Sequence, residues 1–90
     1  MISKRSKRFR ELLQKLPPDV KLQAYTAYRL FKRDPFHPGL HFKLVSSKHP
    51  LYSVRISRGY RALGLRDTDD MILWIWIGTH GEYDQILSRM

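Results

Sequence analysis

The sequence contains no cysteine among its 90 residues, which excludes disulfides, thiolate metal ligands and a thiol nucleophile. It also lacks any apolar run close to the roughly 18 residues that a membrane-spanning helix requires. The amino-terminal stretch MISKRSKRFRELLQ has neither the apolar segment nor the small-residue cleavage site of a signal peptide. We therefore expect a cytoplasmic protein that has no membrane partner.

Acidic residues are scarce. The chain has 8 Asp and Glu against 17 Lys and Arg, which gives a formal net charge of +9, and its pI is near 10.3. A small protein with so strong a positive field attracts polyanions. Nucleic acid, an acidic protein and an anionic membrane all satisfy this condition, and composition alone does not separate them. A membrane is disfavoured because the apolar face of the amino-terminal helix is needed to cover the sheet and leaves little surface for lipid.

The amino-terminal third has apolar residues at helical spacing. In SKRFRELLQKL, the apolar residues fall on one face of a helix that Ser3 or Ser6 would cap. Pro17 ends this helix, and Pro18 suits the first position of a second helix through PDVKLQAYTAYRLFKR. The two segments predict an antiparallel helical hairpin.

After the loop DPFHPGLHF the apolar period changes from helical to alternating. The segments HFKLV, LYSVRIS, YRALGLR and MILWIWIG are predicted strands, and Arg58-Gly59 forms a hairpin turn with Gly59 at positive φ. A short helix from about His80 to Leu87 ends the chain. We predict a single α+β domain over residues 1–90, in which an N-terminal helical hairpin packs on an antiparallel sheet of about four strands.

Arginines on adjacent predicted strands are the first candidate functional feature. Arg55 and Arg61 flank the turn at Arg58, and Lys43 on the preceding strand would extend the same surface. A guanidinium group can donate two parallel hydrogen bonds to a phosphate, so the cluster would suit phosphate binding. The alternative is an exposed sheet face without a specific ligand.

A terminal group of hydrogen-bonding side chains is the second candidate. In a helix that begins near His80, Tyr83 and Asp84 follow at i+3 and i+4, on nearly the same face. Such groups suit RNA cleavage, in which a 2′-hydroxyl attacks its own phosphodiester with help from a base, an acid and cations. The alternative is structural: Thr79 and Glu82 have capping-box spacing, and Tyr83 packs on the core. Spacing alone favours the cap.

No metal site is predicted. His37 and His41 have the i, i+4 spacing of zinc ligands on a helix, but Pro38 and Gly39 between them remove that geometry. We expect neither a metal nor a cofactor.

The helical hairpin, YSVRISRGYRALG and IGTHGEYD follow one another in an order that resembles the RelE/ParE superfamily of toxins from bacterial type II toxin–antitoxin modules. The similarity is closest to RelE-like and HigB-like members. The resemblance implies a metal-independent endoribonuclease that cleaves mRNA in the ribosomal A site. It also implies a cognate antitoxin, the ribosome and mRNA as partners, and no small-molecule cofactor.

The resemblance also implies roles for individual residues. Arg61 in GYRALG matches a phosphate-binding arginine, and Arg55 matches a basic position that is often lysine in RelE. Ser53 departs from the pattern, because another basic residue is expected there. His80 and Tyr83 fall in the terminal region from which family members supply catalytic residues. Taken with the residue patterns above, this predicts His80, Tyr83, Asp84 and Arg61 as catalytic residues and Arg55, Arg58 and Lys43 as RNA-binding residues.

Two other functions stay open at this point. The ParE branch of the same fold poisons DNA gyrase and needs no ribonuclease site. A non-catalytic basic module that binds ribosomal RNA would also explain the charge.

Overall fold

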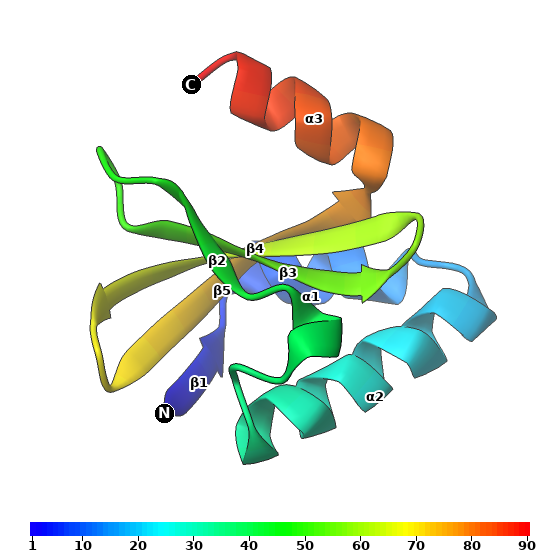
Figure 1. Cartoon of the computed structure of the whole chain (residues 1–90). Helices are drawn as coiled ribbons and strands as arrows, with labels where there is room; N and C mark the ends of the chain where they lie inside the picture. The colour runs from blue at the N-terminus through cyan, green and yellow to red at the C-terminus, as the bar shows by residue number, and fades with distance from the viewer.

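The computed structural model describes all of residues 1–90 and has an α+β fold (Figure 1). Its elements in chain order are β1 (Ile2–Arg5), α1 (Lys7–Gln14), α2 (Pro18–Arg33), the 3-10 helix η1 (Pro38–Leu40), β2 (Lys43–Ser46), β3 (Leu51–Ser57), β4 (Tyr60–Thr68), β5 (Met71–Thr79) and α3 (His80–Ser88). The predicted α+β fold class is confirmed, with two helices before the antiparallel strands β2 to β5 and a short helix after them.

The sheet has five strands in the order β1-β5-β4-β3-β2. Strands β2 to β5 form the predicted antiparallel meander, whereas β1 pairs in parallel with β5 at the edge. This fifth strand was not predicted, because ISKR lacks the alternation of apolar and polar residues that marks a strand. Its Ser3 hydroxyl accepts a hydrogen bond of 2.8 Å from the indole Nε1 of Trp74, which attaches the segment to β5.

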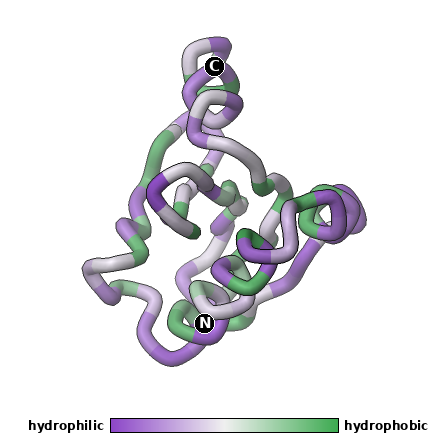
Figure 2. The backbone as a smooth tube through the Cα atoms, turned by 90° about the vertical axis from the view of Figure 1, so that its right-hand side faces the viewer, coloured by the Kyte–Doolittle hydropathy of each residue, from purple (hydrophilic) through white to green (hydrophobic).

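Helices α1 and α2 cover one face of the sheet, and α3 lies over the other (Figure 1). Hydrophilic residues alternate with hydrophobic ones along the helices, so each helix can bury one side (Figure 2). Ser6 caps α1, as one of the two expected positions. The main core forms beneath α1 and α2 and contains the buried residues Phe9, Leu13, Ala24, Ala27, Phe31, Leu40, Val54, Ala62, Ile72, Trp74 and Ile77.

A smaller core holds α3 against the sheet. Its buried members are Leu51 of β3, Leu63 of β4 and Tyr83 of α3. Gly78, just before α3, lies against the ring of Trp76. Only glycine fits at this position, because a Cβ there would lie 2.5 Å from that ring. None of the three helices combines the length and the apolar character that crossing a membrane would require.

The turn between β3 and β4 lies at Arg58-Gly59, as predicted, but the expected conformation of Gly59 is wrong. No glycine in the chain has a positive φ. The pairing of β3 with β4 is instead irregular between Arg55 and Ser57. An irregularity of this kind adds local twist to β3 just before the turn, whose two residues lie between the paired positions Ser57 and Tyr60.

Candidate functional site

Arg55 and Arg61 are directly opposite each other on β3 and β4. Side chains at opposed positions of an antiparallel pair point to the same face of the sheet. Ser53, two residues before Arg55, contacts Tyr83 of α3, so this is the face that α3 covers. The two guanidinium groups therefore lie on the same side of the sheet as the terminal helix.

The guanidinium group of Arg61 is held by the β3–β4 turn. Its Nη1 donates to the carbonyl oxygen of Ser57 at 2.7 Å and to that of Tyr60 at 2.9 Å. A longer contact of 3.4 Å joins it to the carbonyl oxygen of Arg58. These bonds fix one edge of the planar group and fold the side chain back over the turn.

The surroundings of Arg61 disfavour its positive charge. Burial lowers the pKa of this guanidinium first, and the charge of Arg55 lowers it further, while Tyr83 and Asp84 act in the opposite direction. Arginine stays protonated at any physiological pH, so Arg61 keeps its charge. The consequence is a positive electrostatic field around Arg55 and Arg61. An anion placed against Arg55 and Arg61 would relieve that field.

His80 opens α3 next to the same turn. Its backbone N–H donates to the carbonyl oxygen of Gly59 at 2.8 Å. Its Nδ1 lies 3.0 Å from Oδ2 of Asp84, one helical turn later. The carboxylate favours the tautomer with hydrogen on Nδ1, which leaves Nε2 free as a proton acceptor. The imidazole is 45% exposed, so a ligand on this face can reach it.

The capping box occurs together with the His80 cluster. Thr79 accepts a hydrogen bond from the backbone N–H of Glu82, and the Glu82 carboxylate accepts one from the Thr79 N–H at 3.0 Å. The structural alternative for this segment is therefore confirmed. The cap is compatible with a functional role for His80 and Asp84, because neither side chain takes part in the capping hydrogen bonds.

The capping box predicts a pH-dependent stability. Hydrogen bonds from Thr79 lower the pKa of Glu82 below its ordinary value of 4.5. A carboxylate with a lowered pKa in the folded state stabilises the fold above its unfolded pKa, and this stabilisation is lost as the pH falls through the folded pKa. We expect Glu82→Gln to lower the unfolding midpoint at pH 7 and to leave it unchanged well below pH 4.5, as thermal scans across pH would show. An equal difference at every pH would contradict this.

Tyr83 points into the protein. It is only 6% exposed, belongs to the smaller core, and its hydroxyl forms a buried hydrogen bond of 3.1 Å with the Ser53 hydroxyl. Its ring centroid lies 5.8 Å from that of His80 in an edge-on arrangement. Tyr83 thus supports the histidine from below and does not present its phenol at the surface. Sequence reasoning missed the role of Ser53 as its partner.

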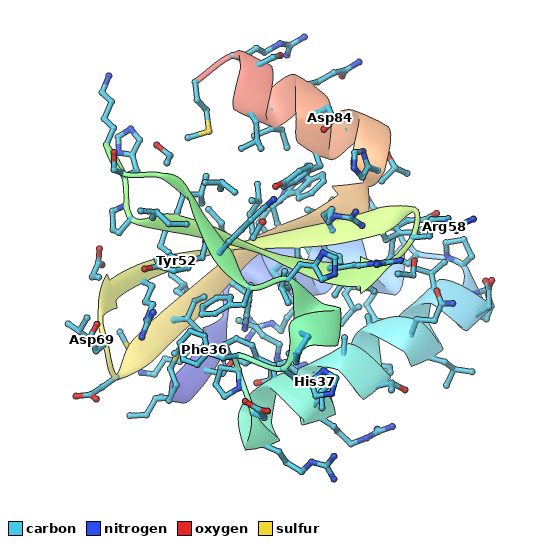
Figure 3. All side chains as sticks on the ribbon, in the orientation of Figure 1. Phe36, His37, Tyr52, Arg58, Asp69 and Asp84 are labelled. Atoms are coloured by element: carbon cyan, nitrogen blue, oxygen red, sulfur yellow. The ribbon has the colours of Figure 1, made fainter.

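The remaining predicted residues lie at the margins of this surface. Arg58 is exposed at the β3–β4 turn, at the tip of the hairpin (Figure 3), and this turn lies next to the start of α3. Lys43 is exposed on the edge strand β2 and pairs in register with Ser53, so it shares the face of Arg55. The structure therefore groups Arg55, Arg61, His80 and Asp84, with Arg58 and Lys43 on either side.

A small basic α+β domain with a cationic strand face suits a protein that binds a polyanion. The family model for the ParE-like toxin domain matches residues 18–85. The chain therefore belongs to the ParE-like toxin domain family of the RelE/ParE superfamily of toxins from toxin–antitoxin systems. No curated protein matches the chain.

Solved structures of RelE proteins share this fold. The RelB-RelE antitoxin-toxin complex from Methanococcus jannaschii matches with a TM-score of 0.72 at 14% identity, over 92% of this chain and 96% of that one. The RelE-RelB complex from Pyrococcus horikoshii gives 0.67 at 18% identity, covering 89% and 94%. The isolated E. coli RelE toxin gives 0.64 at 19% identity, covering 98% and 96%.

Proposed function

We propose that this toxin is a metal-independent endoribonuclease that cleaves mRNA on the ribosome, in the manner of RelE-like and HigB-like toxins. The observation that carries the proposal is an accessible His80, in contact with Asp84, whose backbone bonds the same β3–β4 turn that holds Arg61 opposite Arg55. A gyrase poison needs a cationic surface, but it does not require a histidine whose imidazole is oriented by a carboxylate.

In the proposed reaction, the 2′-oxygen of a ribose attacks the adjacent phosphorus and the bond from phosphorus to the 5′-oxygen breaks. The products are a 2′,3′-cyclic phosphate and a 5′-hydroxyl end. Nε2 of His80 takes part in proton transfer, as a base for the 2′-hydroxyl or an acid for the 5′-oxygen, and water takes or gives the other proton. Arg61 and Arg55 stabilise the negative charge that develops on the phosphate, and Arg58 and Lys43 bind the flanking backbone.

Asp84 and Tyr83 act through His80 in this mechanism. Asp84 orients the imidazole through the 3.0 Å contact with Nδ1. Tyr83 fixes the first turn of α3 by its buried ring and its bond to Ser53. Both are positioning residues, since the phenol is buried away from the surface that RNA would contact.

The buried hydroxyl of Tyr83 gives a direct test of that role. Tyr83→Phe keeps the ring but leaves the Ser53 hydroxyl without its buried partner, at a cost of about 1 kcal/mol in the free energy of unfolding. We expect mRNA cleavage to fall by less than about tenfold, because the ring still supports His80. Urea unfolding and single-turnover cleavage on ribosomes measure the two effects. Loss of cleavage comparable to that in His80→Ala would make the phenol a catalytic group.

A cognate antitoxin is the proposed protein partner. Two of the structures compared above are complexes of RelE with RelB, and a net charge of +9 suits an acidic segment. We place both partners in the cytoplasm, where ribosomes and mRNA are found.

The match to a ParE-like toxin domain favours a second candidate, poisoning of DNA gyrase. Mapping of RNA 5′ ends shortly after induced expression distinguishes the two. The ribonuclease predicts new 5′-hydroxyl ends inside translated codons within minutes. Intact mRNA together with induction of the DNA-damage response would support the gyrase poison instead.

A further inference from the structure

The positive charge of this protein is concentrated away from the candidate site. Residues 1–33 contain 10 Lys and Arg against 2 Asp and Glu, a net charge of +8. The remaining 57 residues contain 7 and 6, a net charge of +1. Residues 1–33 form β1, α1 and α2, and these two helices cover the sheet face opposite α3. Cleavage at His80 does not account for charge on the other side of the sheet.

Two tyrosines and two cations come together within this charged region. A cavity of about 30 Å³ lies between α1, α2 and the sheet, and its lining includes Arg5, Tyr25 and Tyr28. The guanidinium carbon of Arg5 lies 5.6 Å from the ring centroid of Tyr28, and Nζ of Lys32 lies 5.2 Å from it. Tyr28 thus holds one cation from β1 and one from α2 at the same place. Tyr25, one turn earlier on α2, is 37% exposed.

An accessible aromatic ring beside fixed cations suits single-stranded RNA. Unpaired bases stack on aromatic rings, and the cations on either side neutralise the backbone phosphates. The charge alone would also attract an acidic protein segment, but an exposed ring with cations beside it offers the stacking surface that unpaired bases use. On α2 the exposed apolar side chains are Leu22 and Tyr25 alone, among arginines and lysines.

We propose that the surface formed by Arg5, Tyr25, Tyr28 and Lys32 is a second RNA-binding site, which holds a single-stranded segment other than the one at His80. In this site a base stacks on Tyr25, and Arg5 and Lys32 bind the adjoining phosphates. The site works whether or not His80 cleaves RNA, so the proposal does not depend on the nuclease mechanism.

The test measures binding of a fluorescein-labelled oligouridine by fluorescence anisotropy at several salt concentrations. All proteins carry His80→Ala, so that the RNA stays intact. The test variant adds Arg5→Gln and Lys32→Gln. The control adds Lys48→Gln and Arg89→Gln, which remove the same charge from two other exposed positions. A third variant adds Tyr25→Ala. Thermal unfolding verifies that each variant is folded.

We expect Arg5→Gln with Lys32→Gln to weaken binding about tenfold or more and to lower the salt slope of log K by about 1.4, the value for two phosphates of a single strand. Tyr25→Ala should weaken binding about tenfold without changing the slope. The control pair should stay within about twofold of the parent.

Equal losses in the test and control pairs would reduce the surface to a general electrostatic field and overturn the proposal. Unchanged binding of oligouridine by the test pair would also overturn it. If that pair instead lost affinity for an oligoglutamate peptide, the surface would belong to an acidic protein partner.

Discussion

Replacement of His80 by alanine is expected to lower the rate of mRNA cleavage on ribosomes by about 10²- to 10⁴-fold, the usual contribution of a proton-transfer group. The imidazole is nearly half exposed, so its removal leaves the smaller core and the capping box intact. The unfolding midpoint should therefore change little. Primer extension on a reporter mRNA bound to purified ribosomes, under single-turnover conditions, measures the rate.

Asp84→Asn is the matched control for His80→Ala. The Asp84 side chain is 62% exposed, and an exposed ion pair contributes about 0–1 kcal/mol. Cleavage should fall only a few fold, because solvent replaces much of the orientation that the carboxylate supplies. Full activity in His80→Ala would remove the proposed mechanism, and a loss in Asp84→Asn as large as in His80→Ala would make Asp84 the proton-transfer group.

The sequence predicts most of this fold because a segment with helical spacing of apolar residues is followed by a segment in which apolar and polar residues alternate. The helical spacing in α1 and α2 and the alternation in β3 are strong local signals. Strand β1 has no such signal: all its residues except Ser3 are exposed, and it exists because β5 offers a free backbone edge. Pairing that depends on a distant partner is not visible in a local pattern.

In the candidate site, too, some features follow from local sequence patterns and others depend on contacts between distant residues. Alternation along β3 and β4 is enough to place Arg55 and Arg61 on one face once the turn between them is known. The bond between Ser53 and Tyr83 joins residues 30 positions apart and requires α3 to fold back over β3. A serine on the face of two arginines is typical of an exposed strand, yet Ser53 is 2% exposed. Only the position of α3 makes it part of a buried pair.

Replacement of Arg61 by alanine is expected to lower cleavage by about 10²- to 10³-fold, the loss typical when one stabilising group is removed from a transition state that gains negative charge. The variant also loses the bonds to the carbonyl oxygens of Ser57 and Tyr60, so the turn beside His80 would loosen. Single-turnover cleavage measures the chemical effect, and urea unfolding measures the structural one.

Arg61→Lys and Arg55→Ala separate these two contributions. Lysine at position 61 keeps the positive charge but cannot bond the turn carbonyls and a phosphate with one planar group. We therefore expect Arg61→Lys to recover only part of the lost rate. Arg55→Ala removes the opposed charge and none of the turn bonds, so it should reduce cleavage while leaving the free energy of unfolding unchanged or slightly higher.

If Arg61→Lys cleaved as fast as the parent, a point charge would suffice and the bidentate role of Arg61 would be wrong. If Arg61→Ala lost stability but kept its cleavage rate, Arg61 would serve only to close the β3–β4 turn.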